Sequence, residues 1–303
     1  MKEGSLEWLA RLAVWVLMAP LLPGVINKVK AWVAGRRGPP VLQLYYDLVR
    51  LWRKESVLSE AASPGFVGVT VVAWVALLLA AFLLPLGPWG SGTGFSGDVV
   101  LWLGLLALAR FCLAWGALET GSSFEGMGAA REVSFAVLAE ASLLAAVLTL
   151  VIQSQSLSLA TLLWPAAGAA AGLWAAGMFF VLLAENCRVP FDDPNTHLEL
   201  TMIHEVMVLD HSGPLLAAVL HGAALKLMMF SVWLVEAVLP LGTLRGGAAL
   251  AALAGGVLVV AAGVGLVESF MARAAFRRVP LLLTTAFLLC VFALLVAWRG
   301  RVS

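Results

Sequence analysis

The chain has 303 residues, of which 62% are hydrophobic and 12% are charged, and its formal net charge is +1 at pH 7. So apolar a composition excludes an ordinary water-soluble enzyme, and the near-zero net charge gives no support to nucleic-acid binding. Its apolar runs approach the ~20 residues that a helix needs to cross a bilayer of ~30 Å. The sequence therefore predicts a helical membrane protein in which each charge needs an explanation.

Hydropathy predicts a fold class that is all-α and polytopic, with about eight transmembrane helices. A bundle of this kind is itself the domain, so residues 1–303 are expected to form a single transmembrane domain. The expected spans are residues 6–26, 66–86, 99–118, 133–152, 162–184, 214–239, 248–271 and 280–298.

The basic residues predict the orientation of these spans. Most of the 19 Lys and Arg residues fall in the connections at about residues 27–65, 119–132, 185–213 and 272–279. The positive-inside rule places these four connections in the cytoplasm. Both termini are then expected on the non-cytoplasmic side of the cell inner membrane.

The first cytoplasmic connection predicts an interfacial helix. A Gly-Pro-Pro break at residues 38–40 precedes a stretch in which Leu44 and Leu48 share one helical face. Such a helix either lies in the membrane interface or covers a cavity beneath a partner. Arg36 and Arg37, just before it, are expected to contact a partner subunit.

The third cytoplasmic connection is abruptly polar between residues 184 and 214 and contains three of the four histidines. Asp193 followed by a proline predicts a helix N-terminus, and the helix is expected to run to about Leu209. We expect this segment to dock a partner through Arg188, Asp192, Asp193, His197, His204 and Glu205.

One acid and the histidines of this segment raise two further possibilities. Helical spacing places Glu199 on an apolar face, where a carboxylate must be paired, for example with Arg188, or must take up a proton. His197, His204 and His211 are spaced by seven residues, which is ~10 Å along an α-helix. They cannot share one zinc ion with bonds of ~2 Å, so no metal site is expected.

Ionisable residues also fall inside the predicted spans. Each costs at least ~2.5 kcal/mol at membrane depth, and such residues usually line ion or substrate paths or form buried ion pairs. Both interpretations stay open at this point. The residues are Arg110, Glu140, Lys226, Glu236 and Glu268, with Glu185 at the edge of a span.

Short motifs in a fixed order resemble those of a known family. Gly38-Pro39, Arg131 followed nine residues later by Glu140, and Glu185 followed by Pro190-Phe191-Asp192 resemble subunit 1 of the respiratory NADH:quinone oxidoreductase superfamily. Two further stretches narrow the resemblance to one branch of this superfamily. They are THLELTMIHEVMVLDHSG at residues 196–213 and LVESFMARAAFRR at residues 266–278. Both are similar to the homologous membrane-anchor subunit of formate hydrogenlyase and hydrogenase-4 type energy-converting nickel-iron hydrogenases.

The resemblance implies a non-redox junction subunit with no cofactor of its own. Iron-sulfur clusters, and a nickel-iron centre in hydrogenase-type members, would belong to partner subunits. The implied partners are the iron-sulfur small subunit and the nickel-iron-type large subunit of a peripheral arm, antiporter-like membrane subunits and the lipid bilayer. The chain would anchor that arm and couple electron transfer to proton or Na⁺ translocation. The implied proton path comprises Glu140, Glu185, Glu199, Glu236, Glu268, Arg110, Arg131 and Lys226.

Two alternatives remain. The first is subunit 1 of a quinone-reducing NADH or ferredoxin dehydrogenase. Quinone-linked members, however, carry a glutamate-rich run where this chain has Asn195, Thr196 and His197. The second is an autonomous secondary transporter, although the sequence shows neither the internal repeat nor the paired broken helices of that class. Whether the chain is an enzyme in its own right is left open.

Overall fold

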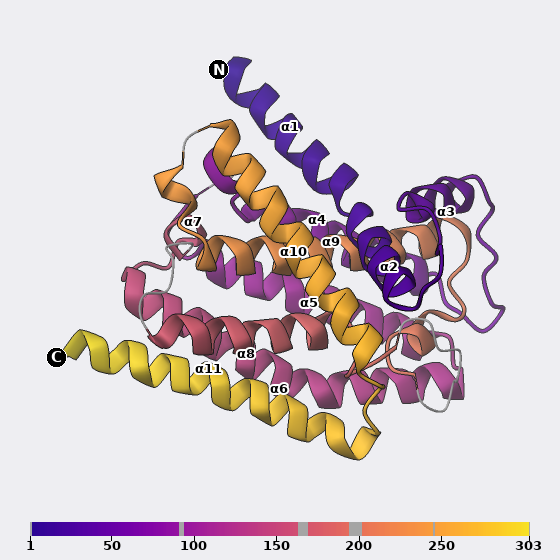
Figure 1. Cartoon of the computed structure of the whole chain (residues 1–303). Coiled ribbons are helices and arrows are strands. Elements are labelled where there is room, and N and C mark those ends of the chain that lie inside the picture. Colours follow the sequence, from indigo (N-terminus) through magenta and orange to yellow (C-terminus); the bar gives the residue numbers. More distant parts are fainter. Residues whose placement is uncertain (1, 91–93, 163–168, 194–201, 245, 303) are drawn as a thin grey trace.

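The computed structural model describes residues 2–90, 94–162, 169–193, 202–244 and 246–302. Within these ranges the chain is a bundle of helices, with no strand (Figure 1). The helices are α1 (Lys2–Met18), α2 (Leu21–Val33), α3 (Gln43–Trp52), α4 (Gly65–Leu83), α5 (Asp98–Glu119), α6 (Ser123–Ser154), α7 (Leu159–Leu162), α8 (Ala169–Glu185), α9 (Gly213–Val238), α10 (Gly247–Phe270) and α11 (Val279–Val302).

The helix lengths confirm the predicted fold class. Among the described residues, 7 segments are long and apolar enough to cross a membrane. The shorter apolar helix Ala170–Glu185 accompanies them, so the predicted bundle of about eight spans agrees with the structure. Four 3₁₀ helices also occur in the described parts: η1 (Gly87–Trp89), η2 (Glu205–Val208), η3 (Leu241–Thr243) and η4 (Phe276–Arg278).

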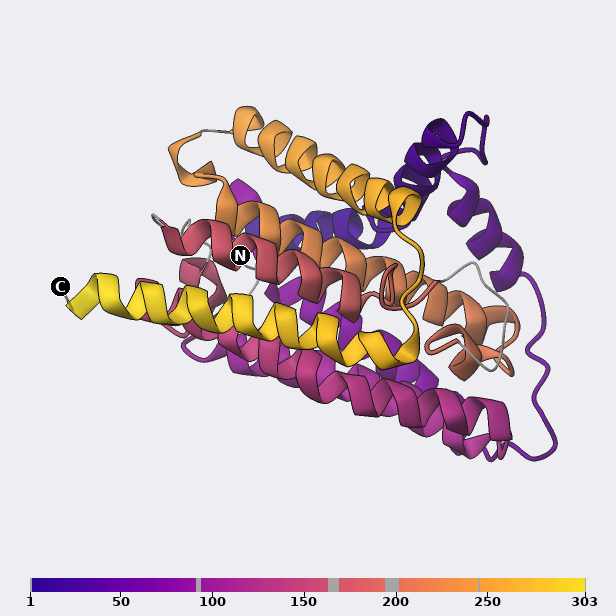
Figure 2. The same ribbon diagram turned by 60° about the horizontal axis from the view of Figure 1, so that its bottom comes forward.

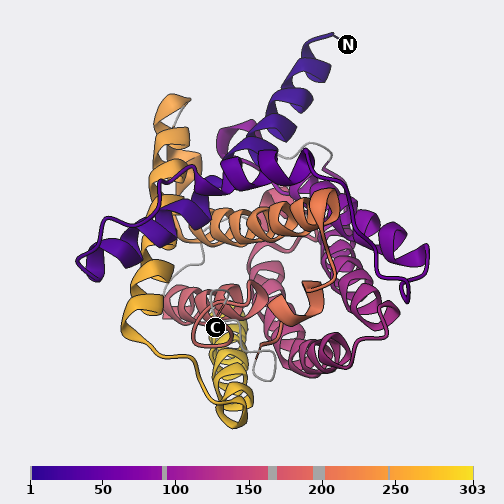
Figure 3. The same cartoon turned by 90° about the vertical axis from the view of Figure 1, so that its right-hand side faces the viewer.

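Helix α9 lies at the centre of the bundle and buries nearly all of its side chains. It packs against α4 on one side, against α8 and α10 on others, and beneath α3. Helix α11 lies along α6 and α8, and α10 crosses the bundle next to α2 (Figures 1 and 2). The connections after α2, α8 and α10 gather at one end, which faces the viewer in Figure 3.

An aromatic cluster joins three helices in the middle of the core. The rings of Trp102 and Trp233 lie 5.2 Å apart, and those of Trp174 and Trp233 lie 5.7 Å apart, both pairs edge to face. Phe230 contacts Trp102 at 6.0 Å. Edge-to-face packing is favourable for aromatic rings, and all four side chains are fully buried. The cluster fixes α5, α8 and α9 relative to one another.

The first predicted span is divided into two helices. Helix α1 ends at Met18 and α2 begins at Leu21. Pro20 lies between them, and a proline lacks the N–H that would continue the helical hydrogen bonds. The two helices together still form one membrane-length segment, Glu7–Val33.

The amphipathic helix predicted after the Gly-Pro-Pro break is confirmed as α3. Leu48 and Leu51 are buried, and they pack with Ala217 of α9. The chain reaches this position because Gly24 of α2 lets the backbone of Val41 approach closely: a Cβ on Gly24 would lie 1.9 Å from the Val41 carbonyl oxygen. The amphipathic pattern therefore buries one face of α3 against α9.

The prediction of a helix from Asp193 to Leu209 is wrong for the part of this segment that the structure describes. Residues 202–209 contain only the short 3₁₀ helix η2. The carboxylate of Asp192 accepts hydrogen bonds from the backbone N–H groups of Ile203 at 3.0 Å and His204 at 3.1 Å. These bonds hold residues 203 and 204 close to Asp192, at the beginning of the connection. A straight helix starting at Asp193 would place residues 203 and 204 far from Asp192.

The second connection is shorter than predicted. Helix α5 ends at Glu119 and α6 begins at Ser123, so most of residues 119–132 are helical. The polar residues at the start of α6 suggested a loop. They instead form the first turns of a 32-residue helix whose apolar part follows them. Glu132 and Glu140 consequently belong to one continuous helix.

Candidate functional site

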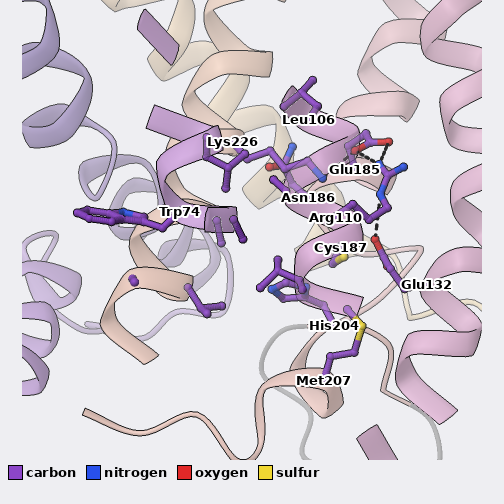
Figure 4. Close-up of a pocket in the computed structure, with 18 of the residues that line it drawn as sticks. Trp74, Leu106, Arg110, Glu132, Glu185, Asn186, Cys187, His204, Met207 and Lys226 are labelled. Atoms are coloured by element: carbon purple, nitrogen blue, oxygen red, sulfur yellow. Dashed lines mark hydrogen bonds and ion pairs between the residues drawn. The ribbon is translucent and has the colours of Figure 1, made fainter. Parts of the chain in front are cut away.

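A cluster of five charged residues joins four helices inside the bundle. Arg110 of α5 donates to Glu185 of α8 at 2.5 Å, contacts Glu132 of α6 at 3.4 Å, and donates to Glu140 of α6. Lys226 of α9 contacts Glu185 at 2.7 Å from the other side. Figure 4 shows Arg110 between Glu132 and Glu185, with Lys226 extending toward Glu185.

The spacing of the acids explains how one arginine reaches three of them. Glu132 and Glu140 are eight residues apart on α6, which is ~12 Å along the helix axis. The guanidinium lies between them and uses its Nε toward Glu132 and one terminal nitrogen toward Glu140. Its other terminal nitrogen meets Glu185, so a single Arg110 forms ion pairs with acids from two helices.

The cluster contains more acids than bases. Three carboxylates face two cations, so the fully ionised cluster carries one excess negative charge. The Glu185 side chain is 1% exposed, whereas that of Glu140 is 45% exposed on the outer face of α6. An excess charge in a poorly solvated region is relieved when a proton binds. The arrangement is therefore suited to exchanging a proton between a buried and a more accessible position.

A cavity of about 60 Å³ adjoins the cluster. Arg110, Glu132, Glu185 and Lys226 line it on one side, and apolar side chains of α4 and α5 line the other. A polar cavity of this size has room for a few water molecules. The buried amide oxygen of Asn186, which has no hydrogen-bond partner in the described parts, supplies one acceptor for such water.

Cys187 also lines this cavity but is not a reactive thiol. Burial raises the pKa of its thiol well above the usual range, and the nearby carboxylates of Glu132 and Asp192 raise it further. A nucleophilic or metal-binding cysteine needs the thiolate form. Among the described residues, no group of three His, Cys, Asp or Glu side chains could hold a metal ion.

Glu268 forms a second buried ion-pair group at the same end of the bundle. Its side chain is fully buried on α10 and contacts Lys30 of α2 at 2.7 Å and Arg188 of the third connection at 3.3 Å. Glu268 thus lies apart from the Arg110 cluster. It connects α2, α10 and the start of the third connection, and it pairs with Arg188, for which the sequence had suggested Glu199 as a partner.

Asp192, predicted as a docking residue, is buried in this chain and holds the third connection in place. It is 1% exposed and contacts Arg273 at 3.5 Å, in addition to accepting hydrogen bonds from the backbone N–H groups of residues 193, 203 and 204. The guanidinium of Arg273 lies 5.2 Å from the centre of the Phe276 ring. These contacts attach the third connection to the segment between α10 and α11.

Two residues predicted for the proton path also lie outside the cluster. Arg131 donates to the Met202 carbonyl at 2.8 Å and lies 4.8 Å from the Phe276 ring centre, so it holds the third connection. Glu236, near the opposite end of α9, accepts the Gly87 N–H at 2.5 Å. Its second carboxylate oxygen is buried with no hydrogen-bond partner in the described parts of the chain.

The remaining predicted docking residues differ in exposure. Arg36 and Arg37 are exposed after α2, as a surface contact requires. Arg188, Asp193, His204 and Glu205 are half-buried in the third connection. His197 and Glu199 lie outside the described residues.

Sequence reasoning missed Glu132, Asn186 and the inward position of His204. Glu132 was assigned to a cytoplasmic loop, and its distance of eight residues from Glu140 could have marked it as a member of the same helical face. His204 lines the cavity at the cluster together with Cys187 and Met207 (Figure 4). Nothing in the local sequence distinguishes it from an exposed histidine.

The fold and the cluster define a class: a polytopic helical membrane protein with a buried acid–base group near the connections at one end of the bundle. The NADH dehydrogenase family matches residues 6–299, and the chain belongs to this family. The resemblance read from the motifs is thereby confirmed.

Two curated relatives come from Escherichia coli (strain K12). Hydrogenase-4 component C is 29% identical over 246 residues, covering 77% of this chain and 75% of that protein. Formate hydrogenlyase subunit 4 is 31% identical over 268 residues, covering 84% and 86%. A chain in the membrane-bound sulfane sulfur reductase, an archaeal respiratory membrane complex, shares the fold with a TM-score of 0.84 at 20% identity, covering 97% of this chain and 99% of that one.

Proposed function

We propose that this chain is the membrane junction subunit of a multisubunit oxidoreductase complex of the energy-converting hydrogenase type. It anchors a peripheral electron-transfer arm through its cytoplasmic connections and couples electron transfer to the movement of H⁺ or Na⁺. The observation that carries this proposal is the excess of carboxylates around Arg110 inside a membrane bundle. The two Escherichia coli relatives are named as a component and a subunit of hydrogenase systems, which supports the same assignment.

The proposed partners follow from the relatives and from the surface. The exposed Arg36 and Arg37 are suited to an acidic face of an iron-sulfur small subunit, and the half-buried Arg188 is proposed to lie at the edge of that contact. The nickel-iron-type large subunit would attach through that subunit, and antiporter-like subunits would lie beside the bundle in the cell inner membrane. All redox cofactors of the complex would belong to these partners.

Glu140 supports a lateral direction for the coupling. Its side chain is 45% exposed at membrane depth, although it pairs with Arg110. A charged group facing hydrocarbon is costly, so a neighbouring membrane subunit is expected to cover this face of α6. Glu185 and Lys226 would form the buried end of the path and Glu140 the end toward the neighbour. Glu268, with its two cations, would hold the cytoplasmic end of the bundle in position.

The quinone-linked alternative receives less support from the site. The cavity at the cluster has a volume of about 60 Å³ and carries charged groups on one side, which suits a few water molecules. Family membership across residues 6–299 also argues against an autonomous transporter.

The test is Glu140→Gln in the assembled complex in sealed vesicles. Glutamine keeps nearly the same volume but removes the titratable proton. Electron transfer from the cytoplasmic donor to an artificial acceptor should continue, while the ion gradient formed during turnover collapses. Glu119→Gln is the matched control, because Glu119 contacts Ser63 and Trp115 outside the cluster. An undiminished gradient in the Glu140 variant would make Glu140 a packing residue and remove the proposed path.

A further inference from the structure

A second cavity lies on the cytoplasmic side of the charged cluster and has a volume of about 140 Å³. Its walls come from Pro23 of α2, Leu44 of α3 and the residues of α9 beneath them. Helix α3, which follows the Gly-Pro-Pro break, thus covers one side of this cavity. Its charged lining residues are Arg188, Asp192 and Glu205.

The two cavities share four lining residues: Asn186, Cys187, His204 and Ala223. The direct way from the outer cavity to the cluster passes these side chains, and the Ala223 methyl group cannot carry a proton. The Asn186 amide does not titrate, and burial keeps the Cys187 thiol protonated. An imidazole can bind a proton on one ring nitrogen and release the other from its second nitrogen. Of the four shared residues, His204 alone carries such a ring.

The backbone of His204 is held where the cavities meet. Its N–H donates to Asp192 at 3.1 Å, and Asp192 is itself held by Arg273 at 3.5 Å. In Figure 4 the ring lies on the same side of the inner cavity as Cys187, below Arg110 and Glu132. The carboxylates that could receive a proton therefore line the same small cavity as the imidazole.

The charge of His204 acts on its surroundings. His211, just before α9, has a pKa lowered to about 4, first by burial and then by the positive charge of His204. The Nε2 of His211 lies 3.0 Å from the hydroxyl of Thr70, which also lines the inner cavity. The other charged groups that line the two cavities around His204 are Arg110, Glu132, Glu185 and Lys226 on the inner side and Arg188, Asp192 and Glu205 on the outer side.

We propose that His204 is the group through which protons pass from the outer, cytoplasmic cavity to the Arg110 cluster. In each transfer the ring accepts one proton from water of the outer cavity and releases one proton from its other nitrogen to water of the inner cavity. A shift of tautomer or a turn of the ring then restores it. This proposal rests on the proposed coupling function and names the site at which that function takes up its protons.

The test uses the intact complex in sealed vesicles with a trapped pH-sensitive dye, and reduced viologen as the electron source. His204→Gln preserves hydrogen bonding but does not titrate near neutral pH. The initial rate of gradient formation per electron transferred should fall at least about ten-fold. In the unmodified complex this rate should decline as the pH rises, because fewer imidazole rings then hold a proton to pass on. The remaining rate in the Gln variant should lack that pH dependence. Added imidazole should restore part of the lost rate.

His221→Gln is the matched control. His221 accepts the indole N–H of Trp74 at 3.0 Å and lies 3.0 Å from the Val16 carbonyl, and it lines neither cavity. A glutamine amide can make both contacts, so the rate should change by less than about two-fold. His204→Glu, which restores a titratable group, should keep more of the rate than His204→Gln and should move the pH profile to lower pH.

Equal rates in the Gln and Glu variants of His204 would overturn the proposal, as would an unchanged rate and pH profile in the Gln variant. The proposed function fails separately. If Glu140→Gln loses the gradient while His204→Gln keeps it, protons reach the cluster by another route and the coupling function stands. If both variants keep the gradient, the coupling function falls as well.

Discussion

Removal of the Lys226 ammonium tests whether the Arg110 cluster is a single electrostatic unit. Lys226→Met preserves most of the length and apolar stem of the side chain but deletes its charge. Glu185 then retains only Arg110, which it shares with Glu132 and Glu140. The fully ionised cluster changes from one excess negative charge to two.

The magnitude follows from the geometry. Opposite charges 2.7 Å apart, the separation of Lys226 and Glu185, attract by about 6 kcal/mol at an effective dielectric constant of ~20. The variant also avoids the cost of removing the Lys226 ammonium from water, which offsets part of the lost attraction. Breaking a buried pair by removing one partner typically costs ~3–5 kcal/mol. The double variant Lys226→Met/Glu185→Gln returns the excess charge to one and should be less destabilised than the sum of the two single variants.

The assay is the midpoint of heat-induced dissociation of the purified complex, measured for both single variants and for the double variant. Each single variant should lower the midpoint by an amount on the order of 10 °C. The double variant should recover part of that loss, and the cycle should give a coupling of roughly 2–3 kcal/mol. Additive losses, or an unchanged midpoint in Lys226→Met, would show that the two charges do not stabilise one another.

Three further predictions concern the connections between the helices. Asp192→Lys should weaken attachment of the peripheral arm several-fold in a quantitative pull-down while leaving membrane insertion intact, because Asp192 positions the connection; unchanged recovery would remove the argument. Gly213→Ala places a Cβ 2.6 Å from the Glu55 carbonyl at φ +52° and should lower the thermal midpoint more than Gly121→Ala, at φ +68° in open space; equal losses would contradict the close approach. His211 has a native pKa of about 4 against 6.5 unfolded, so the unfolded chain binds more protons between these values, and up to about 3 kcal/mol of stability should be lost as the pH falls through that window. His211→Gln should flatten the dependence, and a stability profile that Gln leaves unchanged would assign the effect to other groups.

The sequence alone determined the class of protein and the location of its unusual residues. Apolar runs of membrane length, the basic connections and the charges inside spans are properties of short stretches, which hydropathy reads without knowledge of contacts. The interfacial helix α3 was also predictable, because its leucine spacing is local. The order of the motifs gave the family, which the match over residues 6–299 confirmed.

The tertiary structure alone decided which charges belong together. Arg110 meets Glu140 and Glu185, respectively 30 and 75 residues away along the chain, and Glu268 meets Lys30 across 238 residues. Such pairs depend on the rotation of each helix about its axis and on the helices beside it. The nearly uniform apolarity of the spans leaves that rotation undetermined, because a helix that is hydrophobic on every side has no periodic pattern to mark its inner face.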